Sequence, residues 1–336
     1  MLFCLPYFWE IGIIWGMYNE NIKILKPFKN AYCDALYCGL GKFLKISDEN
    51  YNFIVKNLSR EELSVICEYV AVKNKLAGVG ELNLKTPIIG VGNAALDKYN
   101  LKGSEILSAN YINGLSTRDL VGDRLILEIE DLNDYNEAAL GDIADFVGAT
   151  QMPILIHFGR DLNSIGLTVN RFGCSPAELL ESYGFLDRQC KLYGFNFIDK
   201  EDQKLLAQYS PTVILSPISD GEEGKGGINL YNLIYNRLKF VFSSGKCYNI
   251  DMLKEAKMAI LNTNNLMYQR DLVDFDALLD SIQSEAGEIK INFDFEAIKE
   301  ALLDEKVIVE DEKLYEKLQE LEIEIKKIAN RLKEKN

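Results

Sequence analysis

The chain has one histidine, His157, and this residue limits its possible chemistry more than any other. A mechanism that needs two imidazoles from one chain is excluded, and with it two-histidine zinc sites and histidine-rich metal clusters. His157 lies near the end of the apolar run Ile154–Phe158. It is a candidate general acid or base, but a lone histidine at a strand end is more often a hydrogen-bonded residue of the wall.

Two cations behind apolar runs are candidates for binding an anion. Arg160 lies three residues beyond the histidine, and Lys246 follows the last apolar run in the same way. The guanidinium is a planar fork that suits a carboxylate or a phosphate. We therefore predict a pocket for a small anion or anionic metabolite that depends on Arg160. In the competing interpretation, Asp34 or Asp220 neutralises Arg160 inside the protein and leaves no anion site.

The stretch after residue 218 offers further polar groups. Ser219 and Asp220 either line a ligand pocket or cap the loop that follows. The glycines of Gly221–Gly227 could cradle a phosphate, but the loop also holds two glutamates and one lysine. That charge balance favours a flexible loop over an anion site.

The seven cysteines do not form a recognisable framework. Their number is odd, their spacing is irregular and no C-x-x-C pair occurs, which argues against a disulfide scaffold and a thiolate zinc site. We therefore expect a reducing, cytoplasmic location. Cys174 and Cys190 follow the histidine in the sequence, but no motif supports either one as a nucleophile.

Charge and the N-terminal segment bear on the partners. The formal net charge is −14, so a surface for nucleic acid is not expected. Met1–Tyr18 is nearly all apolar, yet it lacks the features of a signal peptide, contains Glu10 and is short for a membrane span. We interpret it as a buried or capping segment. A translation start at Met17 and, least favoured, a membrane anchor are the alternatives.

Short apolar runs alternate with amphipathic stretches from about residue 85 to 262. Continuous runs of β-branched and aromatic residues are typical of parallel strands that are buried on both faces. The predicted strands are Pro87–Val91, Glu105–Ala109, Arg124–Ile129, Ile154–Phe158, Lys191–Phe197, Thr212–Leu215 and Leu238–Phe242.

Helical patterns lie between and before these runs. The clearest start is Ser175, an N-cap residue followed by Pro176 and by Glu178, which completes a capping box. Alternating strands and helices predict a parallel α/β protein, and the length fits a TIM-like (β/α)8 barrel. A doubly wound sheet would need a glycine-rich turn for which Gly39–Gly41 is too weak. The predicted helices are Ser59–Leu76, Asn136–Val147, Ser175–Leu186, Asp199–Tyr209, Leu230–Arg237 and Asp251–Leu261.

The chain changes character after about residue 283. Asp311–Asn336 is charged and helical, with an apolar stripe at spacings of four and three residues. The stripe either docks on the chain's own body or forms a homo-oligomer. We predict an N-terminal apolar segment with a reduced accessory β region over 1–24, a barrel over 25–282 and a C-terminal helical extension over 283–336. The stripe consists of Leu314, Leu318, Leu321, Ile325, Ile328 and Leu332.

Residues 151–262 resemble the amidohydrolase superfamily of metal-dependent hydrolases, in particular its deaminase and chlorohydrolase-like branch, which includes aminofutalosine deaminase-type hydrolases. Pro153–Phe158 is similar to the family's fifth barrel strand, which ends in a metal-binding histidine. The likeness extends over about residues 25 to 280. The other segments that match in order and spacing are Lys26–Asp34 for the first strand, Ser175–Leu186 for the helix after the fifth, Lys191–Asp199 for the sixth strand, Ser216–Asp220 for the seventh and Phe242–Lys246 for the eighth.

The resemblance implies a metal site, and the sequence departs from it at most positions. Active members use a divalent metal to generate hydroxide near neutral pH. Here only His157 is kept, and the proton-shuttling glutamate three residues further on is replaced by Arg160, which stays protonated. The other ligand positions match Tyr32 and Asp34 in the first strand, Tyr193 in the sixth and Gly245 in the eighth.

Three functions follow as expectations. The favoured one is a catalytically degenerate, metal-free barrel with no cofactor, which binds a small ligand or a partner. The second is an active hydrolase or deaminase for non-peptide C–N bonds, with a rebuilt site and one divalent metal such as zinc. The third is a regulatory or structural subunit of an active homologue. The catalytic candidate is His157, and the candidate pocket residues are Tyr32, Asp34, Arg160, Tyr193, Ser219, Asp220 and Lys246.

Overall fold

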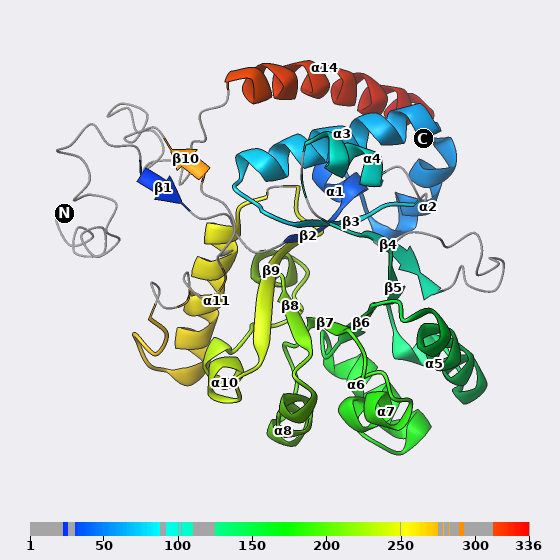
Figure 1. Ribbon diagram of the computed structural model, residues 1–336, viewed down its shortest axis with the longest axis vertical. Helices are drawn as coiled ribbons and strands as arrows, with labels where there is room; N and C mark the ends of the chain where they lie inside the picture. The colour runs from blue at the N-terminus through cyan, green and yellow to red at the C-terminus, as the bar shows by residue number, and fades with distance from the viewer. Residues whose placement is uncertain are drawn as a thin grey trace.

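Eight parallel strands close into a barrel in the computed structural model of the chain (Figure 1). The structure describes residues 23–25, 31–87, 92–99, 101, 103–109, 125–248, 250–274, 278, 282, 289–291 and 312–335. Neighbouring strands follow the chain order, and the last strand pairs with the first. The TIM-like fold predicted from the sequence is thereby confirmed. The strands are β2 (Ala31–Asp34), β3 (Leu82–Lys85), β4 (Glu105–Ser108), β5 (Leu125–Ile129), β6 (Ile154–Phe158), β7 (Cys190–Gly194), β8 (Thr212–Leu215) and β9 (Lys239–Gly245).

Most predicted strands coincide with the observed ones, and one does not. The runs at 154–158 and 212–215 match β6 and β8 end to end. The prediction of a strand at Pro87–Val91 is wrong at its first residue: Pro87 lies in a bend, and residues 88–91 lie outside the described part. The strand is β3, whose sequence Leu-Asn-Leu-Lys is too short and too polar to be recognised as an apolar run.

Side chains alternate between the inside of the barrel and the surrounding helices. The inner cluster holds one or more side chains from seven of the eight strands and is separate from the outer core. Asp34, Glu128 and His157 lie two residues beyond members of this cluster, so they face inward where their strands end. In barrels, this C-terminal end carries the active site. The inner cluster consists of Tyr32, Ile106, Ile126, Leu155, Tyr193, Ile214 and Val241.

The helices cover the outside of the barrel (Figure 1). Capping boxes at Ser59 and Ser175 start two of them, as predicted. The pattern at 39–41 lies at the end of a helix, where Gly39 packs against Ile66, so it is no phosphate-binding turn. The helices are α1 (Ala35–Leu40), α2 (Asp48–Asn57), α3 (Arg60–Leu76), α4 (Gly92–Lys98), α5 (Glu137–Thr150), α6 (Leu162–Phe172), α7 (Pro176–Ser182), α8 (Lys200–Tyr209), α9 (Pro217–Glu222), α10 (Leu230–Tyr235) and α11 (Met252–Met267), with a short 3-10 helix η4 (Leu132–Asp134).

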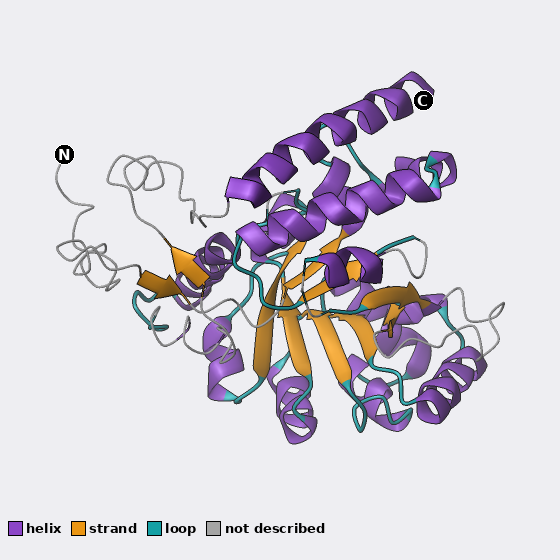
Figure 2. Cartoon of the chain, turned by 45° about the horizontal axis from the view of Figure 1, so that its top comes forward, coloured by secondary structure: helices purple, strands orange, loops and turns teal. Residues whose placement is uncertain are grey.

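The C-terminal helix α14 (Glu312–Lys335) lies along α3 and also contacts α1 (Figure 2). Leu321, Ile325 and Leu332 of the predicted stripe are buried there. The interpretation that the stripe docks on the chain's own body is confirmed. Homo-oligomer formation through α14 stays a prediction, and it would have to use another face of the helix.

A small antiparallel sheet joins β1 (Lys23–Leu25) with β10 (Ile289–Ile291). This is β structure outside the barrel, and β10 lies within the segment that the sequence assigned to a helical extension. The apolar segment Met1–Tyr18 lies outside the described residues. Among the helices that the structure describes, none combines the length and the apolarity needed to cross a membrane.

Candidate functional site

A series of close polar contacts connects three strands at the mouth of the barrel. One carboxylate oxygen of Glu128, Oε2, lies 2.7 Å from the Lys85 ammonium. The other, Oε1, lies 3.0 Å from His157 Nε2. Both Glu128 oxygens are therefore engaged, and the only histidine of the chain is held by one of them.

Sequence reasoning missed Lys85 and Glu128, although one of them left a signal. Glu128 stands two residues after Ile126 in a predicted strand that is otherwise apolar from Leu125 to Ile129. A charged residue on the inward face of such a strand indicates a functional position. Lys85 could not be found in the same way, because its strand was not recognised.

The charges of Lys85 and Glu128 stabilise each other. Burial alone raises the pKa of a carboxyl, but Lys85 and His157 more than offset it, and the pKa of Glu128 falls to about 2. Burial also favours neutral Lys85, yet Glu128, Glu130 and Asp34 hold the pKa of its ammonium above the ordinary value. Both groups are therefore ionised near neutral pH, and Glu128 is a poor proton acceptor.

Tyr32 and Asp34, which the resemblance matches to the first-strand ligands, make different contacts. Asp34 Oδ1 accepts a hydrogen bond from the Leu36 amide at 2.8 Å and caps α1, while its Oδ2 accepts one from the Tyr51 hydroxyl at 3.0 Å. Tyr32 lies deeper, in the inner cluster, with the Lys191 ammonium 5.4 Å from its ring centre. The two side chains do not form a pair of ligands.

The sixth- and eighth-strand positions pack against each other. The Tyr193 hydroxyl is 2.8 Å from Ser216 Oγ, to which it donates, and its ring lies 4.8 Å from that of His157. Gly245 has φ +55°. A side chain there would place its Cβ 2.5 Å from Ser219 and 3.0 Å from the Tyr193 hydroxyl. The space that an eighth-strand aspartate would need is thus filled.

These observations test whether the residues fit the metal that the resemblance implies. Within the described part of the chain, no three histidine, cysteine, aspartate or glutamate side chains are grouped so as to hold a metal ion. Gly245 leaves no room for a ligand, and a lysine ammonium lies against Glu128. The residues do not fit the metal site of the active family.

Arg160 is neutralised within the protein. Its Nη2 donates to Asp220 Oδ1 at 3.0 Å and lies 3.5 Å from Glu223 Oε1. Its guanidinium lies over the ring of Tyr193, at 5.0 Å. The interpretation that Asp220 pairs with Arg160 is confirmed, and Asp34 has other partners. An anion would have to displace two carboxylates, so the predicted anion pocket gains no support here.

Lys246 is paired as well. Its ammonium lies 2.9 Å from Asp48 Oδ1 at the start of α2 and 3.8 Å from Glu223 Oε2. Its backbone amide donates to Ser219 Oγ at 3.0 Å. Ser219 and Asp220 belong to α9, so they bind the loops around the mouth to one another. The structure brings Arg160, Tyr193, Ser219, Asp220 and Lys246 together as partners of one another or of neighbouring acids. Asp34 and Tyr32 have other partners.

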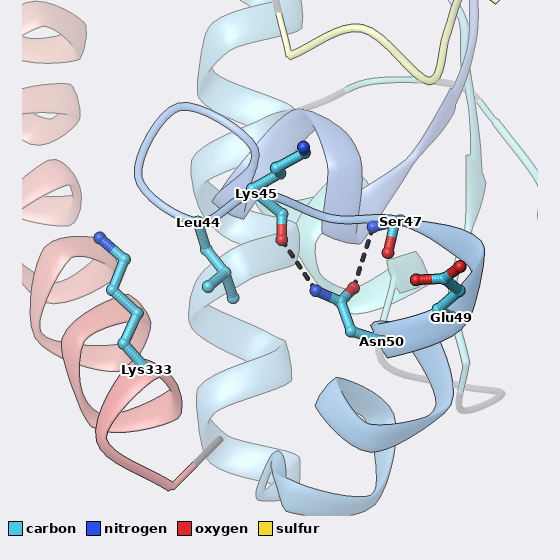
Figure 3. A pocket seen from close by; sticks show the side chains of 6 residues that line it. All are labelled: Leu44, Lys45, Ser47, Glu49, Asn50 and Lys333. Atoms are coloured by element: carbon cyan, nitrogen blue, oxygen red, sulfur yellow. Dashed lines mark hydrogen bonds between the residues drawn. The ribbon is translucent and has the colours of Figure 1, made fainter.

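Two cavities lie beside this network. An open pocket of about 470 Å³ separates the start of α2 from the end of α14, and Figure 3 shows Lys333 of α14 on one side and Asn50 of α2 on the other. A cavity of about 10 Å³ beside His157 has room for about one water molecule. The small cavity is lined by Leu132, His157, Phe158, Gly159, Ser164, Ile165, Thr168 and Pro176.

Known proteins similar to this chain include deaminases. A 5-methylthioadenosine/S-adenosylhomocysteine deaminase from Thermococcus kodakarensis is 28 % identical over 127 residues, 37 % of this chain and 30 % of that protein. A zinc-bound adenosine deaminase from Xanthomonas campestris has a TM-score of 0.68 at 10 % identity, over 91 % of this chain and 86 % of that one. A guanine deaminase from C. acetobutylicum with bound guanine has a TM-score of 0.62 at 14 % identity, over 74 % and 68 %. No family model matches.

The fold is a closed β/α barrel like that of these deaminases. The resemblance to the amidohydrolase superfamily, in its deaminase-like branch, is confirmed by these similarities. The structural likeness concerns the fold, because the identities are low. In sequence, the chain spans about three tenths of the length of the curated deaminase.

Proposed function

We propose that the protein is a metal-independent amidohydrolase-like barrel that has lost hydrolase activity and works by binding a small molecule or a protein partner. The observation that carries the proposal is the engagement of His157 by Glu128, whose other oxygen is held by Lys85. An imidazole and a carboxylate in this state are positioned as structural partners. The crowding at Gly245 gives independent support, because it excludes the eighth-strand ligand.

The charged residues at the barrel mouth do not favour one kind of ligand or partner over another. Both candidate cations, Arg160 and Lys246, are paired with carboxylates. Binding of a small anion stays a prediction from the sequence. The anion would have to displace Asp220 from Arg160. We place the protein in the cytoplasm, since a reducing compartment suits the free thiols of the described residues. These are Cys33, Cys38, Cys67, Cys174, Cys190 and Cys247.

Elemental analysis combined with an activity assay tests the proposal. The protein is produced in medium with zinc, manganese and iron, dialysed, and analysed for metal per chain. It is then incubated with 5-methylthioadenosine, S-adenosylhomocysteine, adenosine and guanine while ammonia is measured. We expect no stoichiometric metal and no ammonia. About one metal per chain together with release of ammonia would overturn the proposal.

An active deaminase with a rebuilt site is the second candidate, and the similarity to curated deaminases favours it. In that case His157 would act as the acid or base, with Glu128 holding its ring in place. Ammonia release that His157→Gln abolishes would establish this function. A regulatory subunit is the third candidate, and it would co-purify with a larger, histidine-rich homologue.

A further inference from the structure

The ammonium of Lys85 is surrounded by acidic groups from other strands. It contacts Glu128 at the end of β5 and Glu130 just beyond it. Asp34 at the end of β2 also interacts with it electrostatically. Two carboxylates thus contact a single ammonium at the place where related barrels are expected to hold a cation.

The Glu128 carboxylate cannot be left without a cation at low cost. Its side chain is 3 % exposed. A buried carboxylate that loses its cationic partner destabilises the fold strongly, because desolvation is no longer compensated. Without Lys85, this side chain would have to take up a proton or another cation. The groups then facing the gap would be the Glu128 carboxylate and the His157 imidazole, two donors of the kinds that bind zinc, cobalt or manganese.

We propose that Lys85 is a resident cation, which takes over the charge-balancing role of a metal at the barrel mouth and keeps divalent transition metals out. This inference rests on the proposed metal-independent function and gives it a physical cause. The chain carries its cation on β3, covalently attached, against the Glu128 and Glu130 carboxylates. Lys85 is therefore the residue that determines which cation the mouth contains.

Replacing Lys85 with methionine tests the inference, because the change removes the charge and keeps most of the volume. Zinc affinity is measured by titration calorimetry, cobalt binding by visible absorption, and the melting temperature is recorded with and without zinc. We expect Lys85→Met to bind zinc at least about tenfold more tightly than the wild-type chain. Adding Glu128→Gln or His157→Gln should remove the gain.

Two variants serve as controls. Lys85→Arg keeps a positive charge and should exclude metal as the wild-type chain does. Lys191→Met removes another partly buried lysine of the same barrel, whose ammonium lies over Tyr32. It should leave zinc affinity unchanged, which separates removal of this particular cation from a general loss of positive charge.

The possible outcomes separate the inference from the proposed function. A wild-type chain that binds one metal tightly would contradict both. A metal-free wild-type chain with no gain in Lys85→Met would contradict only the inference. Should Lys85→Met not fold, Lys85→Gln is measured beside it, and zinc is expected to restore folding of at least one. If both stay unfolded with zinc, Lys85 is a structural partner only and the inference is wrong.

Discussion

Arg160 shows how a residue that looks functional in the sequence becomes structural in the fold. The loop after β6 brings it over Tyr193, and α9 supplies Asp220. Gly194 makes this approach possible: it has φ +117°, and a Cβ there would lie 2.1 Å from Arg160 Cγ. The guanidinium is thus enclosed by aromatic and acidic groups, which a sequence pattern cannot reveal.

Removing Arg160 should therefore destabilise the protein. The Asp220 side chain is 2 % exposed, so Arg160→Ala leaves a buried carboxylate without its cation. We expect a loss of about 3–5 kcal/mol in urea unfolding. Lys246→Ala is the matched control, because its partner Asp48 is 81 % exposed, and we expect it to cost less than about 1 kcal/mol. Equal effects of the two variants would show that Arg160 is not held as the structure indicates.

At the scale of elements, the sequence was most informative where strands are mostly apolar. β6 and β8 were predicted with their ends, because each is apolar except for one residue, His157 in β6 and Thr212 in β8. β9 was predicted too short, since its last residues, Ser243, Ser244 and Gly245, are polar or lack a side chain yet are buried. β3 was missed for the same reason. The polar ends of the strands are where the site lies, so the site was the least predictable part.

Contacts across the barrel were also beyond reach of the sequence. The pairing of Lys85 with Glu128 joins residues more than forty positions apart, on strands that are not neighbours in the barrel. They meet because the two strands lie on either side of β4. The likeness to a known family assigned His157 and Tyr193 to neighbouring strands, and the structure has them on β6 and β7. That likeness could not show which other residues surround them.

The crowding around Gly245, at the end of β9, can be tested by substitution. Gly245 and Gly173 both have left-handed φ values, but an added Cβ meets Ser219 at the first and nothing within 4 Å at the second. Gly173→Ala should cost only the backbone strain, about 1–2 kcal/mol. Gly245→Ala should cost a further ~1–3 kcal/mol from overpacking. Equal melting temperatures for the two variants would mean that the mouth can open to admit a side chain.

The docking of α14 on α3 leads to a second prediction at the scale of elements. Leu321 is 2 % exposed in this contact, whereas Ile323 on the same helix is 56 % exposed. Leu321→Asp should lower the free energy of unfolding by at least ~2–5 kcal/mol, because it loses a buried leucine and buries a charge. Ile323→Asp should change it by less than about 0.5 kcal/mol. Light scattering on both variants shows whether any oligomer depends on either face.

For the whole molecule, two buried carboxyls give stability opposite dependences on pH. Glu128 is held ionised by Lys85 and His157. Glu255 on α11 accepts a hydrogen bond from the Ile218 amide of α9 at 3.0 Å. Burial is the main reason that the pKa of Glu255 rises to about 8, helped by Asp220, Asp251 and Glu222 and opposed by the Ile218 hydrogen bond. The net charge of −14 adds general repulsion as pH rises.

The pKa shifts of these two groups predict where stability is lost. Because the pKa of Glu128 is lower in the folded state than its ordinary 4.5, its contribution is present above that pH and disappears as the pH falls toward 2. Because the pKa of Glu255 is higher when folded, its protonated form favours the native state, and stability falls as the pH rises from about 4.5 to 8. Urea unfolding of the wild-type chain between pH 2 and 9 should therefore give a maximum of stability on the acidic side of neutrality. On either side of this maximum the free energy of unfolding should fall by roughly 1.4 kcal/mol per pH unit for one fully coupled group. Glu255→Gln cannot ionise, so it should flatten the alkaline decline and exceed the wild-type chain in stability near pH 8, while its acidic decline stays. Glu128→Gln should do the reverse and flatten only the acidic side. An alkaline slope that survives in Glu255→Gln would show that the overall negative charge, and not this carboxyl, limits stability above neutral pH.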